Sequence, residues 1–288
     1  MHEFDFIRAE SVEHAGELLR IGGGRVIAGG TDVIPRLQRG WDAGKVLIDI
    51  SSLPDLRFIH ELDNEVEIGV LVTYADLLDS PLLQQAAPAL LQAAATVGCP
   101  QTRSRGTIGG NIANASPAGD TLPPLLCSQA KVHYLRDGKK STLALEKLLI
   151  GPGETLLQPG DLLLSVSLQK PVGDQESVYL KLGNRKGMNI AVASAALQAR
   201  FSPDHRIEDI LIALGSVAPT PVRSPGAEEV LAGAELTPDL LDHAAEQVRK
   251  DISPISDVRA TAARRCEAAV ALVKRGLREI TRERIAHG

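Results

Sequence analysis

The sequence has few cysteines and no pattern of metal-binding side chains. Its three cysteines, Cys99, Cys127 and Cys266, are scattered and odd in number. They form neither a disulfide framework nor the paired spacing that holds zinc or an iron–sulfur cluster. The seven histidines are isolated too, and none lies at metal-ligand spacing from another or from a cysteine. We therefore expect no metal site in this chain, and the cysteine usage fits a reducing cytoplasm.

Long apolar runs and excess positive charge are also missing. No apolar stretch approaches the roughly 20 residues of a membrane span, and the first five residues carry acidic side chains where a signal peptide would carry basic ones. The formal net charge of −5 supplies no concentrated basic surface for nucleic acid. We expect a cytoplasmic protein with no membrane span and no nucleic-acid partner, which binds small molecules or other proteins.

The chain is long enough to bury a sizeable core, with 288 residues of which 44% are hydrophobic. Residues 1–55 read as alternating strands and helices, with apolar strands at 26–28 and 46–48 on either side of a glycine-rich turn. Residues 56–172 predict a second unit of strands and helices, and residues 173–288 a third, in which antiparallel strands precede helices. The expected class is therefore α+β, with two N-terminal subdomains and a C-terminal domain.

Individual elements can be placed within the second and third units. Strands are expected over 66–72, 132–135, 162–168, 178–182, 190–200 and 207–214, and a helix over 88–97. Residues 98–124, rich in Gly, Pro, Asn, Ser and Thr, read as a long loop, which is typical of a functional or disordered segment. In the last helix an apolar face repeats every three or four residues, and the arginines, Arg265 among them, fall outside it and predict a mostly solvated face.

The first candidate for chemistry is the turn after the strand at 26–28. It comprises Val26, Ile27, Ala28, Gly29, Gly30, Thr31, Asp32 and Val33. Two glycines let backbone N–H groups approach an anion without obstruction from a Cβ, and a helix opening near Asp32 adds its positive end. A tight turn that needs a positive φ explains the same residues, so both readings stay open.

Two known phosphate motifs are absent from this region. No lysine followed by serine or threonine comes after the glycines, as a nucleotide-triphosphate loop requires. The nearest six-residue window, 22–27, precedes the strand and ends in Ile27, so the dinucleotide fingerprint of a Rossmann unit is missing. The pattern therefore disfavours a nicotinamide-binding Rossmann domain.

The second candidate lies within the long loop, from Arg105 to Asp120. Its core comprises Thr107, Ile108, Gly109, Gly110 and Asn111. Hydroxyl and amide side chains occur throughout, and we expect Gly109 and Gly110 to expose N–H donors, while Asp120 adds a carboxylate able to hold sugar hydroxyls. Two such loops would suit a diphosphate if folding brings them together; a plain Gly/Asn-rich turn region is the alternative.

Ordered along the chain, these motifs resemble the flavin subunit of the xanthine dehydrogenase and aerobic carbon monoxide dehydrogenase family, the molybdenum hydroxylases. The resemblance rests on residues 28–32 and 101–111, and it extends through three C-terminal landmarks, at 181–191, 215–223 and 257–260. It implies the PCMH-type FAD-binding fold, formed by subdomains 1–55 and 56–172, and a flavoprotein C-terminal domain at 173–288.

The same resemblance assigns roles to individual residues. It implies that the two diglycine loops, Val26–Val33 and Thr107–Asn111, bind the FAD diphosphate. Asp120 would hold hydroxyls on the flavin side, Leu163 would pack near the flavin, and Lys181 would lie close to the isoalloxazine edge. No catalytic residue is expected in this chain.

The resemblance further implies an electron relay. FAD would exchange electrons between [2Fe-2S] clusters of a small partner subunit and an external carrier such as NAD, while a molybdopterin-binding large subunit acts on the substrate. The molybdenum cofactor and the clusters would lie only in those partners, in a complex expected to be a dimer of heterotrimers. Two alternatives stay open: a stand-alone FAD-dependent oxidoreductase acting on a small organic substrate, and a non-catalytic nucleotide-binding module.

Overall fold

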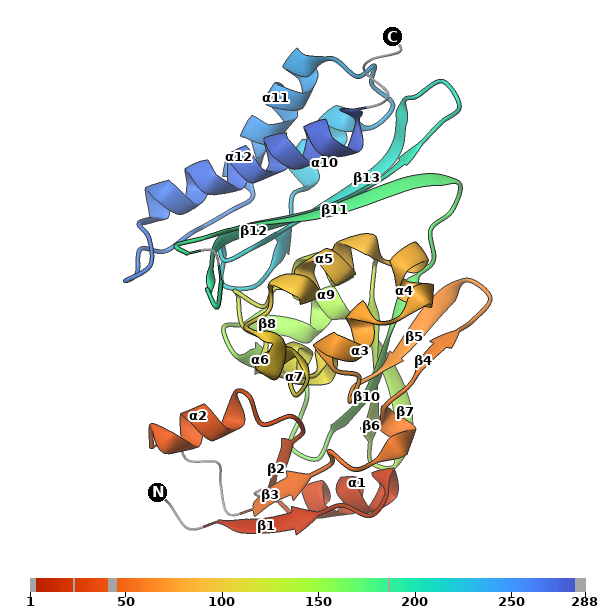
Figure 1. Ribbon diagram of the computed structural model, residues 1–288, viewed down its shortest axis with the longest axis vertical. Helices are drawn as coiled ribbons and strands as arrows, with labels where there is room; N and C mark the ends of the chain where they lie inside the picture. The colour runs from red at the N-terminus through yellow and green to blue at the C-terminus, as the bar shows by residue number, and fades with distance from the viewer. Residues whose placement is uncertain (1–3, 23, 41–45, 186, 283–288) are drawn as a thin grey trace.

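The computed structural model describes residues 4–22, 24–40, 46–185 and 187–282. Its first unit contains a parallel sheet in the order β1-β3-β2, at the bottom of Figure 1. The elements are β1 (Asp5–Arg8), α1 (Val12–Arg20), β2 (Gly24–Ile27), α2 (Val33–Gln38) and β3 (Val46–Asp49). The expected alternation of strands and helices is confirmed.

The second unit is built on a five-stranded antiparallel sheet. Its order is β4 (Ile59–Glu61), β5 (Glu65–Gly69), β10 (Leu162–Gln169), β6 (Lys131–Arg136) and β7 (Lys139–Ala144). Around it lie η1 (Pro54–Leu56), α3 (Tyr74–Leu78), α4 (Pro81–Ala86), α5 (Pro88–Thr96), α9 (Leu145–Leu148) and the small pair β8 (Leu149–Gly151) and β9 (Glu154–Thr155). One continuous hydrophobic core joins this unit to the first.

The stretch 98–124 is not the long loop that its composition predicts. It contains α6 (Pro100–Arg103), α7 (Ile108–Asn114) and α8 (Leu122–Cys127). Its prolines and threonines start these helices: Pro100 stands in the first turn of α6, and Thr107 is the N-cap of α7. Proline in a first helical turn needs no N–H partner, and a threonine cap satisfies one, so residues that read as loop-formers define helix starts.

The third unit contains a four-stranded antiparallel sheet in chain order. It comprises β11 (Asp174–Gly183), β12 (Ala191–Phe201), β13 (Ile207–Gly215) and β14 (Val222–Arg223). The helices α10 (Pro225–Leu231), α11 (Pro238–Gln247) and α12 (Ala262–Ile280), with the short η2 (Val248–Lys250), follow it. Figure 1 shows α12 above this sheet and α5 below it, so the sheet lies between its own helices and those of the second unit.

The α+β class is confirmed, and each of the segments 1–55, 56–172 and 173–288 contains one of the main sheets. The boundaries between these segments stay a prediction. Within the described ranges, no helix is long and apolar enough to cross a membrane. Among the same residues, no group of three or more His, Cys, Asp or Glu side chains is placed to hold a metal ion.

Arg265 departs from the solvated face expected for the arginines of the last helix. It is only 4% exposed, and its guanidinium donates to the carbonyls of Val192 at 2.7 Å and Ser216 at 3.0 Å and to Asp257 Oδ1 at 2.7 Å. Helical periodicity marks a residue as off the apolar stripe, but it does not show that a turn from another element folds over it.

Candidate functional site

The first diglycine loop leaves the end of β2 and enters α2. Gly30 has a φ of +73°, which glycine adopts without the steric cost that other residues incur. A Cβ built on Gly29 would lie 1.7 Å from the carbonyl oxygen of Arg105. Gly29 is therefore required because another segment of backbone lies directly against it.

The second diglycine loop is tied to the chain that follows β5. The N–H groups of Ile108 and Gly109 donate to the carbonyls of Val72 (3.0 Å) and Val70 (3.1 Å), and Tyr74 N–H donates to Gly106 O (3.1 Å). The strand expected over 66–72 ends at Gly69. Val70 N–H still donates to Leu164 O of β10 at 3.1 Å, but the carbonyls of Val70 and Val72 accept from the second diglycine loop.

The expectation that Gly109 and Gly110 expose N–H donors is wrong, because both N–H groups form hydrogen bonds within the protein. Gly109 N–H is bound to Val70 O, and a Cβ on Gly109 would lie 2.4 Å from Val70 Cβ. Gly110 N–H donates to Thr107 Oγ1 at 3.0 Å, as part of the N-cap of α7. Gly109 thus serves internal packing, whereas Gly110 is exposed and a Cβ there would approach only Thr107 Oγ1.

Open donors occur instead in the first loop. No other described residue accepts a hydrogen bond from the backbone N–H of Gly29, Gly30, Thr31 or Asp32. A run of consecutive N–H groups in a glycine-containing turn forms a concave anion-binding surface. The donor set of this loop therefore fits a phosphate group.

Folding brings the two loops together. Besides the contact of Gly29 with Arg105, the Arg36 guanidinium of α2 donates to Asn114 Oδ1 of α7 at 2.7 Å. Asp32 Oδ2 forms an ion pair with the same arginine, 3.0 Å from its Nε. Two loops more than 70 residues apart in the sequence thus lie against each other.

Two further predicted residues, Asp120 and Lys181, are joined in a buried ion pair. Lys181 Nζ lies 2.7 Å from Asp120 Oδ2, and their side chains are 5% and 11% exposed. Tyr179, two residues before Lys181 on β11, donates its hydroxyl to Asp120 Oδ1 at 2.8 Å. Burial raises the pKa of Asp120, whereas Lys181 and Tyr179 act to lower it.

Lys181 is among the residues predicted from the sequence, whereas Tyr179 is not. The available signal was the alternation of β11, because residues two apart on a strand point to the same face. Leu163, on β10 opposite Tyr134 of β6, is 7% exposed and belongs to the main hydrophobic core. Its contact with the flavin stays a prediction.

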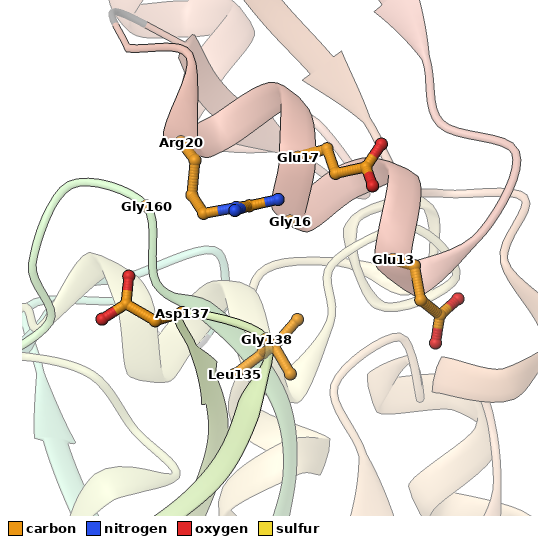
Figure 2. A pocket seen from close by; sticks show the side chains of 8 residues that line it. All are labelled: Glu13, Gly16, Glu17, Arg20, Leu135, Asp137, Gly138 and Gly160. Atoms are coloured by element: carbon orange, nitrogen blue, oxygen red, sulfur yellow. The ribbon is translucent and has the colours of Figure 1, made fainter.

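A hollow of about 200 Å³ lies elsewhere, between α1 and the turn that joins β6 to β7. Figure 2 shows Arg20 on the α1 wall and Asp137 on the opposite wall, with Glu13 and Glu17 nearby on the helix. None of the sequence-predicted site residues lines it, and its excess of carboxylates does not suit a phosphate.

Two family models match consecutive parts of the chain. Residues 2–171 match the FAD binding domain in molybdopterin dehydrogenase, and residues 178–280 match the CO dehydrogenase flavoprotein C-terminal domain.

Individual relatives match over nearly the full chain. The glyceraldehyde dehydrogenase medium chain of Sulfolobus acidocaldarius is 33% identical, over 96% of this chain and 98% of that protein. The carbon monoxide dehydrogenase medium chain of Hydrogenophaga pseudoflava is 31% identical, over 95% and 96%. A solved structure of carbon monoxide dehydrogenase from the same organism superposes with a TM-score of 0.92 at 31% identity and covers 96% of both chains.

Proposed function

The chain belongs to the family of FAD-binding medium subunits of molybdopterin-dependent dehydrogenases, and we propose that it serves as the electron-transfer subunit of such a complex. Bound FAD would couple one-electron iron–sulfur clusters of a partner subunit to an external two-electron carrier. The alternative of a stand-alone oxidoreductase is not supported, because the relatives are named as medium chains or FAD-binding subunits of dehydrogenases.

The observation that carries this function is the meeting of the two diglycine loops. The first loop offers four consecutive N–H groups without a partner among the described residues. The second, Thr107–Asn111, is fixed beside it through Arg105 and Asn114. We assign Val26–Val33 and Thr107–Asn111 to the diphosphate of FAD and Asp120 to its hydroxyl groups, and we place Leu163 and Lys181 beside the flavin ring system.

The partners follow from the same family. We propose a molybdopterin-binding large subunit and a [2Fe-2S] small subunit, assembled with this chain as a dimer of heterotrimers in the cytoplasm. Three free cysteines support a reducing compartment. NAD is the external carrier that we propose to test first.

Copurification with its neighbours tests this function. The tagged chain, expressed together with the genes beside its own, should copurify with two further subunits. That preparation should contain molybdenum and iron and should show the yellow absorbance of flavin. The chain purified alone should take up FAD but should not oxidise organic donors. A folded chain that takes up no FAD would contradict the cofactor assignment, and turnover of an organic donor by the lone chain would contradict the relay.

A further inference from the structure

Both carboxylate oxygens of Asp120 are held by side chains of one strand. Tyr179 and Lys181 lie two apart on β11 and reach Asp120 Oδ1 and Oδ2 at 2.8 and 2.7 Å. Lys181 Nζ also donates to Thr96 O at 3.4 Å, so two of its three donors are used within the protein. The side chain of Lys181 is thus held against Asp120 by contacts within the protein.

Side chains of other elements hold Tyr179 and Lys181 in place beside Asp120. Tyr179 N–H donates to Gln92 Oε1 of α5 at 2.7 Å, and Ser194 of β12, directly opposite Lys181, adjoins the Tyr179 hydroxyl. Tyr179 is 5% exposed. Its buried hydroxyl donates to Asp120 Oδ1.

We propose that Tyr179 is a positioning residue for FAD binding, which together with Lys181 fixes the Asp120 carboxylate so that it accepts hydroxyl groups of the cofactor. This inference rests on the proposed function, because it takes Asp120 as a ligand of FAD. Each carboxylate oxygen has about two acceptor sites, so the contacts to Tyr179 and Lys181 leave one on each oxygen for the cofactor.

The charge of Asp120 depends on the same two partners. Burial raises its pKa, and Lys181 and then Tyr179 oppose that rise. The Asp120 charge in turn acts on two tyrosines, Tyr179 and Tyr74 of α3. Burial, together with this charge, raises the pKa of both, so both phenols stay protonated. Loss of either partner of Asp120 should raise its pKa further, so the carboxylate would be protonated at a higher pH.

Titration of the FAD-free protein with FAD at a series of pH values tests the proposal. For wild type, affinity should fall as acid protonates Asp120. Tyr179→Phe should weaken binding about tenfold near neutral pH, the worth of one hydrogen bond to a charged group, and should move the acid fall to higher pH. Lys181→Gln should move it further, because the charge of Lys181 is the larger of the two influences.

Tyr134→Phe is the matched control, since Tyr134 is a similarly buried tyrosine on β6. It should leave both affinity and pH midpoint unchanged. A merely structural role for Tyr179 would lower affinity equally at every pH, and an unmoved midpoint in both Tyr179→Phe and Lys181→Gln would overturn the proposal. If wild type itself takes up no FAD, the proposed function fails first, which distinguishes the two failures.

Discussion

The carbonyl oxygen of Arg105 occupies the space in which a side chain of residue 29 would stand. A Cβ built on Gly29 would lie 1.7 Å from that oxygen and 2.5 Å from its carbon. The contact joins the end of β2 to the start of the second diglycine loop. Because real Cβ atoms do not approach backbone so closely, any side chain at position 29 must push the two loops apart.

Gly29→Ala should therefore damage both stability and cofactor binding. Overpacking of a close contact costs about 1–3 kcal/mol, and neither backbone segment can move aside like the end of a flexible side chain. Urea unfolding of the FAD-free chain should show this loss, together with reduced FAD uptake. An unchanged unfolding midpoint would mean that the two loops are not in contact.

Gly110→Val should act on the cofactor alone. Gly110 is exposed at the start of α7, and a Cβ there would approach only Thr107 Oγ1, at 3.1 Å. A branched side chain should obstruct the phosphate, while the free energy of unfolding changes by less than about 1 kcal/mol, because glycine and valine differ in helix propensity by less than that. Flavin absorbance per protein measures the occupancy.

Ala263→Val serves as its control, because it places the same side chain at an exposed position of α12. It should change the free energy of unfolding by a similarly small amount, less than about 1 kcal/mol, and keep full FAD occupancy. If Gly110→Val also keeps its FAD, the assignment of the second diglycine loop to the diphosphate is wrong.

The sequence predicted the two loops because each is a local pattern. A strand that runs into Gly29-Gly30 and a threonine three residues before Gly110 are visible in single stretches of chain. The use of each glycine was not visible: Gly29 is needed for Arg105 and Gly109 for Val70, both distant in sequence. Requirements set by a distant backbone leave no periodic signal.

The two residues of the buried ion pair were predicted from the sequence, but their pairing was not. Asp120 and Lys181 were each assigned to the cofactor, but their contact with one another depends on how β11 packs against the segment that carries Asp120. Likewise, the prolines of 98–124 suggested a loop, whereas Pro100 begins α6 and Pro123 stands in the first turn of α8. Composition records the residues but not the positions that they take in a helix.

Arg265→Met should cost at least about 2 kcal/mol of stability. It would leave the buried carbonyls of Val192 and Ser216 without the Arg265 donor, and each unsatisfied buried group costs about 1–3 kcal/mol. Arg264→Met, one residue earlier and exposed, should stay within about 0.5 kcal/mol of wild type. Equal unfolding midpoints for the two variants would contradict the buried role of Arg265.

Asp120→Asn should reduce both FAD affinity and the stability of the FAD-free chain. The substitution leaves the Lys181 ammonium, 5% exposed, without its carboxylate. Removal of one partner of a buried ion pair costs about 3–5 kcal/mol, and we expect the lower end of that range because the asparagine oxygen can still accept a hydrogen bond. Urea unfolding of the FAD-free chain measures the loss.

Addition of Lys181→Met to Asp120→Asn separates the two effects. With no charge left to bury, stability should return to within about 1 kcal/mol of wild type, since an apolar replacement of a buried pair is often neutral. FAD affinity should stay low, because the carboxylate that accepts the cofactor hydroxyls is still absent. A double variant whose loss equals the sum of the losses of Asp120→Asn and Lys181→Met alone would show that the two residues contribute independently, because a coupled pair must give a non-additive cycle. Recovery of FAD binding in the double variant would instead show that Asp120 matters to the cofactor only through the charge balance of Lys181.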